Sequence, residues 1–191
     1  MMRTRSSGFT LVEILVVVVI VGIMLTFATL AIDSSGNRAI EDKLVTESER
    51  VEQLYKLAQE EAELKGIEIG FLYTGTHYAF LVVGPDGDWI PLTDGPLRPR
   101  PIPQPLEFAL RVEDRAVPPA QNLPEAPRDD APKASDASAP EIVPQVMLLS
   151  SGEITPFTLD LTTPALPVRY RVTATLLGQV SKERFDREGL R

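Results

Sequence analysis

The sequence predicts an α+β protein in which one long N-terminal helix packs on an antiparallel β-sheet head. The first observation behind this prediction is the position of the prolines. All 17 prolines of the 191-residue chain lie from Pro85 onward, and proline breaks helix interiors, so only the first part of the chain can form a long helix. The second observation is that short runs of alternating apolar and polar residues, separated by glycine and proline turns, follow Gly66 and indicate strands.

The N-terminus carries a short basic segment before a long apolar one. Arg3 and Arg5 are the charged residues of segment 1–8. Ile14–Ile32 is a run of 19 residues without a charge, which is long enough to cross a bilayer as a helix. Because basic residues precede this run and acidic residues follow it, we expect a cytoplasmic N-terminus and a C-terminal head on the other side of the membrane.

Glu13 stands at the start of this apolar run. A carboxylate at membrane depth costs about 2.5–3.5 kcal/mol on insertion scales and usually marks a functional position. The alternative interpretation is an ordinary secretory signal peptide cut near Ala31. A discarded signal peptide has no use for this carboxylate, so Glu13 favours a retained membrane segment.

The residues Gly8–Ile14, which read Gly-Phe-Thr-Leu-Val-Glu-Ile, resemble the processing motif of type IV pilins and type II secretion pseudopilins. The match combines a basic leader, a glycine, an aromatic residue, a glutamate four residues later and an apolar span. The resemblance implies that a prepilin peptidase cuts after Gly8 and removes leader 1–8. It also implies that the new N-terminus, Phe9, is N-methylated.

The same resemblance implies a subunit-assembly role for Glu13, which would neutralise the α-amino group of a neighbouring subunit inside a filament. A buried charge is tolerable only when it is paired. On this interpretation the mature chain keeps segment 9–32 as the transmembrane half of the N-terminal helix.

The apolar pattern continues beyond the membrane segment and predicts an amphipathic helix half over residues 33–65. Most glutamates of this segment lie away from the apolar stripe, and Gly66 is a suitable stop signal. Asp33–Asn37 contains poor helix formers and indicates either a bend at the membrane surface or a segment that unwinds in a filament. The stripe repeats at spacings of four and three through Leu44, Ser48, Val51, Tyr55, Ala58 and Ala62.

The predicted head covers residues 66–191 and consists of strands. Ile67–Tyr73 and His77–Val83 flank Thr-Gly-Thr and predict a hairpin. Further strands are predicted at Leu106–Val112, Gln145–Leu149, Ile154–Leu161 and Val168–Leu177, the last in the chain.

A proline-rich stretch over residues 117–144 interrupts the strand pattern. It holds seven prolines and few large apolar groups, so it gains little from burial to offset the entropy of ordering. We expect an extended loop, and the sequence leaves open whether it is filler or a partner-binding segment.

The composition argues against an enzyme and against cofactors. Cysteine is absent and His77 is the one histidine, which excludes thiolate or multi-histidine metal sites and leaves little room for the usual catalytic triads. Asp86-Gly87-Asp88 lacks the ligand spacing of a calcium loop and is better explained as a turn. The net charge of −8 makes the chain a poor binder of nucleic acid, whose phosphates would repel it.

Three segments of the head carry a second resemblance. Trp89–Leu92, Leu97–Arg100 and especially Leu148–Phe157 resemble minor pseudopilin H of the type II secretion system, the GspH/FimT-like group that shares its head with the minor pilins FimT and FimU. The resemblance implies a periplasmic head of two β-sheets on a subunit anchored in the inner membrane.

The implied function is that of a low-copy subunit that helps to initiate or cap a pseudopilus, which drives folded exoproteins through an outer-membrane channel. The implied partners are the prepilin peptidase, other major and minor pseudopilins, the inner-membrane assembly platform and membrane lipid. A minor type IV pilin for pilus assembly or DNA uptake is the alternative. A periplasmic enzyme with a plain signal peptide is disfavoured by Glu13 and by the lack of a catalytic constellation.

Overall fold

The computed structural model describes residues 11–124 and 142–186, and within its helix it leaves out the side chains of residues 27–35. The predicted leader 1–8 and most of the proline-rich stretch therefore lie outside the described residues. The chain divides into two compact units, Met1–Ile40 and Glu41–Arg191.

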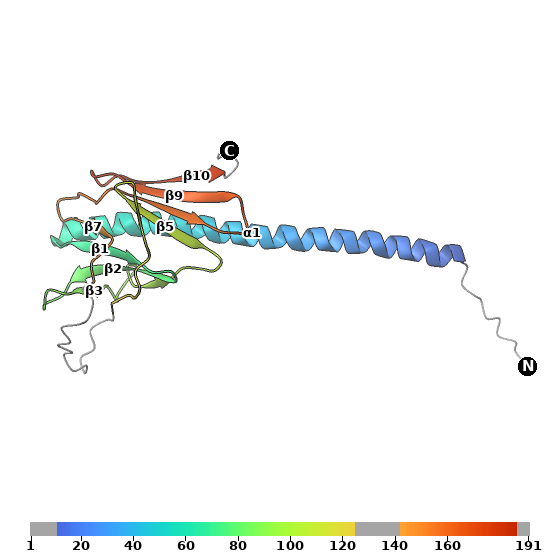
Figure 1. The fold of residues 1–191 in the computed structure, drawn as a ribbon, viewed down its shortest axis with the longest axis horizontal. Helices are drawn as coiled ribbons and strands as arrows, with labels where there is room; N and C mark the ends of the chain where they lie inside the picture. The colour runs from blue at the N-terminus through green and yellow to red at the C-terminus, as the bar shows by residue number, and fades with distance from the viewer. Residues whose placement is uncertain (1–10, 125–141, 187–191) are drawn as a thin grey trace, which may run out of the picture. The chain divides into compact units, whose positions relative to one another are not determined.

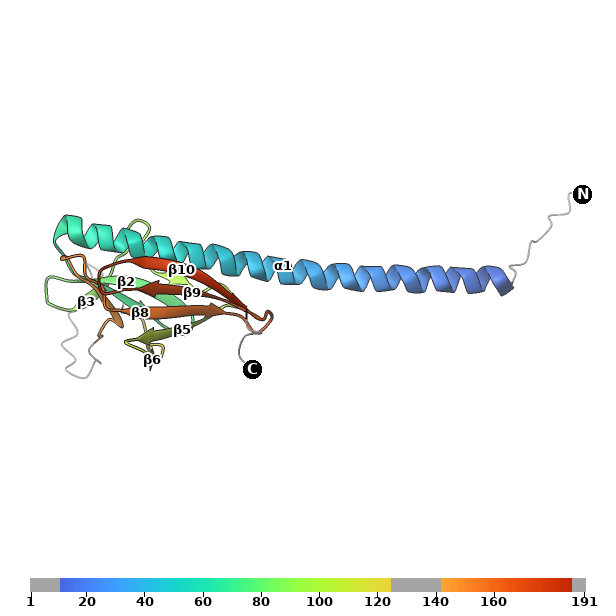
Figure 2. The ribbon, with the colours of Figure 1, turned by 90° about the horizontal axis from the view of Figure 1, so that it is seen from above.

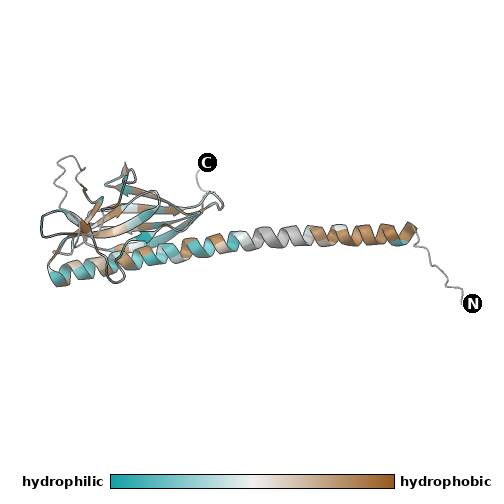
Figure 3. Ribbon diagram, turned by 90° about the horizontal axis from the view of Figure 1, so that it is seen from below, coloured by the Kyte–Doolittle hydropathy of each residue, from teal (hydrophilic) through white to brown (hydrophobic). Residues whose placement is uncertain are grey.

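Helix α1 runs over Leu11–Lys65 and contributes to both units. In the first unit its residues 11–26 are exposed and predominantly apolar, as the brown turns in Figure 3 show. The backbone is helical through residues 33–37, where the sequence indicated a bend or an unwinding segment. Among the described residues, no helix combines the length and the hydropathy that a membrane span requires. The predicted span, Ile14–Ile32, extends into residues whose side chains are not described.

In the second unit a first antiparallel sheet has the strand order β3-β2-β1-β7, with β4 paired to β2 as well (Figure 1). The predicted hairpin is present, because β1 and β2 pair directly and Tyr73 lies opposite Tyr78. The strands of this sheet are β1 (Ile69–Tyr73), β2 (His77–Val83), β3 (Trp89–Pro91), β4 (Arg100–Pro101) and β7 (Val146–Leu148).

A second antiparallel sheet has the order β10-β9-β8-β5-β6, and most of it is visible beside α1 in Figure 2. In β8 and β9 buried and half-buried residues alternate strictly, so one face of this sheet enters the core. Its strands are β5 (Glu107–Val112), β6 (Arg115–Val117), β8 (Phe157–Thr162), β9 (Val168–Ala174) and β10 (Val180–Asp186).

The core forms where the predicted helix stripe meets both sheets. All six stripe residues from Leu44 to Ala62 are buried, and α1 ends at Lys65, directly before Gly66 as the sequence predicted. Tyr55 lies at the centre, with its ring 5.0 Å from that of Phe71, 5.5 Å from Phe80 and 4.5 Å from Phe157. Because Phe71 and Phe80 belong to the first sheet and Phe157 to the second, one helix residue joins both sheets.

Both ends of the proline-rich stretch pack on the first sheet. The part of the stretch that can form an extended loop is therefore shorter than the predicted range 117–144. Leu123 and Ile142 cover the buried residues Leu72, Ala79 and Leu81. Ala120 N–H donates to Tyr73 O at 2.9 Å, and the Tyr73 hydroxyl donates to Val117 O at 2.9 Å.

This covering explains why every residue of β1 is buried. It also explains Gly70, where a Cβ atom would lie 2.4 Å from Pro144 Cγ. The few apolar residues in the stretch were too scattered for the sequence to predict contact with the sheet.

Strand β10 was not predicted, because the last strand was expected to end at Leu177. Its residues alternate between basic and acidic or apolar types, a pattern typical of a solvated surface. In the structure Lys182 lies 3.0 Å from Glu49 and Arg184 lies 3.3 Å from Glu41, so β10 is tied to α1 by ion pairs. Neither acid is near β10 in the sequence, which is why the local pattern could not show the pairing.

Two nested deletions test the packing of the proline-rich ends. In a fragment of residues 41–191, replacing residues 125–141 with a short Gly/Ser linker should change stability little, because closure entropy grows slowly with loop length. Replacing 117–144 should lower the unfolding free energy by several kcal/mol, since exposing each buried leucine costs about 1.5–3 kcal/mol. Urea unfolding of the two variants measures the difference, and equal stabilities would contradict the packing.

Candidate functional site

Of the predicted processing and assembly residues, Glu13 alone lies in the described part of the chain. Gly8 and Phe9 lie outside the described residues, so the predictions for them stay predictions. Glu13 belongs to the first turn of α1, and its side chain is exposed in the single chain. A carboxylate is favoured there, because the free N–H groups of a helix N-terminus carry partial positive charge.

Glu47 is a second acidic residue of interest on α1, and no role was predicted for it from the sequence. The segment that contains it was expected to keep most glutamates off the apolar stripe, but only 1% of the Glu47 surface is exposed. Its position reveals why: it follows Leu44 by three residues and precedes Val51 by four, so it shares their helix face. That spacing was the available signal.

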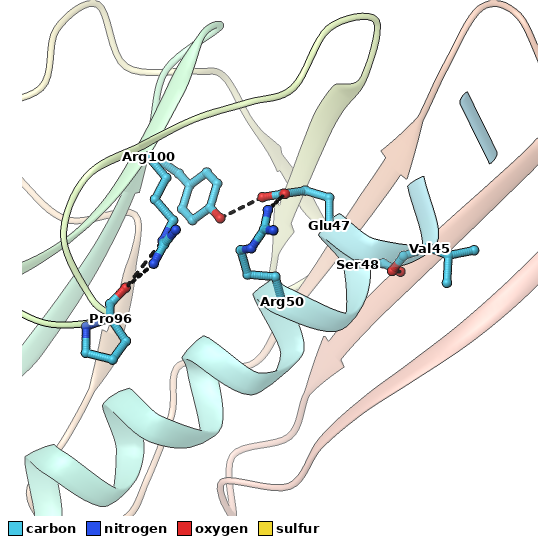
Figure 4. A network of polar contacts seen from close by, with 7 residues as sticks. Val45, Glu47, Ser48, Arg50, Pro96 and Arg100 are labelled. Atoms are coloured by element: carbon cyan, nitrogen blue, oxygen red, sulfur yellow. Dashed lines mark hydrogen bonds and ion pairs between the residues drawn. The ribbon is translucent and has the colours of Figure 1, made fainter. Parts of the chain in front are cut away.

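The Glu47 carboxylate binds two partners (Figure 4). The Tyr78 hydroxyl of β2 donates to Glu47 Oε1 at 2.6 Å, and the guanidinium of Arg50 forms an ion pair with Glu47 Oε2. Burial raises the pKa of Tyr78 above its ordinary value, and the hydrogen bond to Glu47 raises this pKa further. The bond joins α1 to the first sheet, and the neutral phenol is the form that makes it.

The segments before and after β4 add further polar contacts beside Glu47. Arg100 pairs with Tyr78 across β4 and β2, and its guanidinium donates to Pro96 O at 3.1 and 3.3 Å (Figure 4). Lys43 Nζ donates to Gln104 O at 3.2 Å. A shallow hollow of about 270 Å³ lies between α1 and the segment after β4, lined by Asp42, Lys43, Thr46, Glu47, Arg50 and Pro103.

The groups of this cluster are suited to holding α1 and the first sheet together. Glu47 is engaged by a phenol and a guanidinium, and a tyrosine with a raised pKa stays protonated at neutral pH, so neither group is prepared to act as a base. In the described part of the chain, no group of three or more histidine, cysteine, aspartate or glutamate residues could hold a metal ion. The cluster therefore sets the position of α1 on the first sheet.

The outer face of the second sheet carries another charged network. Arg171 on β9 donates to both carboxylate oxygens of Asp160 on β8, at 2.7 and 2.8 Å. The guanidinium groups of Arg169 and Arg171 each lie 5.1 Å from the ring centroid of Phe185 on β10. These contacts connect three strands on a solvent-facing surface, and they need no ligand to be satisfied.

Comparison with known proteins supplies the family. Residues 3–29 match the prokaryotic N-terminal methylation motif. The chain is 30% identical over 172 residues to "Type II secretion system protein H" of Aeromonas hydrophila, covering 89% of this chain and 88% of the relative. The chain belongs to the type II secretion system protein H family. The protein of the same name from Pseudomonas aeruginosa is 29% identical over 157 residues, which cover 82% of this chain and 83% of the relative.

A solved structure shows the same fold. The minor pseudopilin EpsH from the type 2 secretion system of Vibrio cholerae matches with a TM-score of 0.55 and 21% sequence identity, over 74% of this chain and 96% of that one. The predicted α+β class, a long helix with a head of two antiparallel sheets, is confirmed. The resemblance to minor pseudopilin H is confirmed by the family as well.

The raised pKa of Tyr78 predicts a loss of stability at alkaline pH. In the unfolded chain this phenol ionises near its ordinary value of 10.0, while the folded state holds the proton more tightly. The stabilisation is therefore complete below pH 10 and declines above it, by up to about 1.4 kcal/mol per pH unit for one group. Tyr78→Phe should flatten this decline and, by breaking the bond to Glu47, cost about 1.5–3 kcal/mol at neutral pH.

Tyr55→Phe is the matched comparison, because the pKa of Tyr55 is also raised by burial while its hydroxyl has no hydrogen-bond partner among the described residues. It should flatten the alkaline decline and leave the stability at neutral pH nearly unchanged. Urea unfolding of residues 41–191 between pH 7 and 11 measures both effects. A full decline in both variants would contradict this account.

Proposed function

We propose that this chain, a minor pseudopilin of the type II secretion system, helps to initiate or cap the pseudopilus that drives folded exoproteins through the outer-membrane channel. The observation that supports this most strongly is the extent of the family relationship, which spans 89% of this chain and 88% of a protein H relative, and the N-terminal methylation motif matched at residues 3–29 agrees with it. No catalytic step is part of this role.

The proposal includes an anchored precursor that is processed at its N-terminus. Residues 1–8 would lie in the cytoplasm, segment 9–32 would anchor the chain in the inner membrane, and the head would lie in the periplasm. The basic residues before the apolar run support this orientation. The partners are then the prepilin peptidase, which cuts after Gly8, the assembly platform of the inner membrane, other major and minor pseudopilins, and membrane lipid.

Glu13 would act once Phe9 has become the N-terminus. The carboxylate lies near the start of α1, on a helix whose neighbouring residues are apolar and exposed. In lipid such a group is stabilised by a cation at short range, and the α-amino group of Phe9 on an adjacent subunit has the right charge. The pair would fix the axial position of the incoming subunit.

Processing can be tested on membrane fractions of cells that express the full chain. We expect mass spectrometry to find N-methylated Phe9 as the mature N-terminus, and we expect Gly8→Val to remain uncut because only glycine lets the backbone lie close to the peptidase. Gly22→Val is a suitable control, since a Cβ atom there meets nothing within 4 Å. A mature N-terminus near Ile32 would support the signal-peptide interpretation instead.

Glu13→Gln tests the assembly role separately from processing. The variant keeps the size of the side chain and removes its charge, so the leader should still be removed while entry into the filament and exoprotein release fall. Glu49→Gln is the matched control, because it makes the same change at an exposed ion pair with Lys182 in the head. Normal crosslinking and secretion with Glu13→Gln would show that the charge is dispensable.

A further inference from the structure

The turn between β9 and β10 carries two exposed leucines. Leu176 and Leu177 occupy its central positions, and Gly178 N–H closes the turn by donating to Thr175 O at 3.0 Å. The exposed fractions of the two leucines are 54% and 79%. Such positions usually carry proline, asparagine, aspartate or glycine, which favour turn geometry. Two leucines there leave apolar surface in water and add nothing to the turn.

The backbone of this turn is fixed against α1. Gly178 has a φ of +76°, and a Cβ atom there would lie 2.0 Å from Gln59 Nε2 and 2.5 Å from Gly152 O. Gln59 Nε2 donates to Gly152 O at 3.0 Å, and Ile154 N–H donates to Leu176 O at 3.2 Å. Because the turn is already ordered, a partner that covers the leucines would meet a small ordering cost.

A third exposed leucine belongs to the same end of the head. Leu64, which is 86% exposed, lies in the last turn of α1, one residue after Glu63, whose carboxylate lies against Gly152. Figures 1 and 2 both show the end of α1 and the β9–β10 connection at this end. Leu64, Leu176 and Leu177 are called the end leucines below.

The surroundings of the end leucines are acidic. Glu60, Glu63 and Glu153 are exposed there. Lys65, the basic residue of the last helical turn, is paired with Glu61. A surface that covers the end leucines would therefore gain from lysine or arginine side chains at its edge.

We propose that the end leucines dock on a neighbouring pseudopilin, at a surface that is apolar in its centre and basic at its edge. This inference rests on the proposed function. The end leucines lie at the Lys65 end of α1, and the helix enters the head at Glu41. In a filament whose subunits all point the same way, contacts are head to tail, so the end of one head meets a different surface of the next subunit.

The absence of cysteine from the chain makes this contact directly testable. Leu177→Cys places one thiol at the turn, and Ala109→Cys places one at an exposed position in β5, on the outer face of the second sheet. Each full-length variant replaces the native protein in secreting cells, and a short crosslinker joins the thiol to nearby lysines. We expect Leu177→Cys, and not Ala109→Cys, to crosslink to another pseudopilin.

A second variant tests the same contact without introducing a thiol. Leu177→Glu adds a charge to the acidic surroundings and should reduce co-isolation with other pseudopilins roughly tenfold. Its thermal stability should be unchanged, because the side chain is exposed. Crosslinking to a second copy or to an exoprotein, or equal crosslinking or none from both positions, would overturn the inference, as would undiminished co-isolation of Leu177→Glu. If the wild-type chain itself does not co-isolate with pseudopilins, the proposed function fails instead.

Discussion

Tyr55 lies where α1 and both sheets meet, and the rest of the head depends on this contact. Its ring packs on Phe71 and Phe80 of the first sheet and on Phe157 of the second. A helix that serves two sheets at once needs a wide apolar face, and the stripe from Leu44 to Ala62 provides it. The cost is that a charged group on that face must be paired within the folded chain.

Glu47 shows how that requirement is met. A buried carboxylate without partners would destabilise the fold, whereas Tyr78 and Arg50 engage both of its oxygens. The arrangement is directional, because a one-residue shift of α1 along the sheet would separate Glu47 from Tyr78. Apolar contacts around Tyr55 thus supply most of the stabilisation, and the Glu47 cluster specifies which alignment of helix and sheet is adopted.

The features that the sequence predicted are those set by local pattern. The helix stripe, the helix end before Gly66 and the β1–β2 hairpin each follow from residues close together in the chain. Apart from Glu47, whose spacing was a local signal, the features discussed here that it missed depend on distant residues. Strand β10 is stabilised by pairing with β9 and by acids of α1, and the ends of the proline-rich stretch gain their order from contact with the first sheet. Propensity carries little information about such contacts.

A similar distinction can be made between two kinds of unusual residue. Some have their side chains paired or buried within the chain, and others leave apolar surface that a partner could cover. Glu47 breaks the apolar pattern of its helix face, and the head compensates with Tyr78 and Arg50. The central leucines of the β9–β10 turn also break a local rule, yet both remain largely exposed in the folded chain. In natural proteins such uncompensated exceptions tend to coincide with functional surfaces. On the proposed function, the fixed turn beside the end of α1 is a place where selection for assembly can outweigh selection for a good turn.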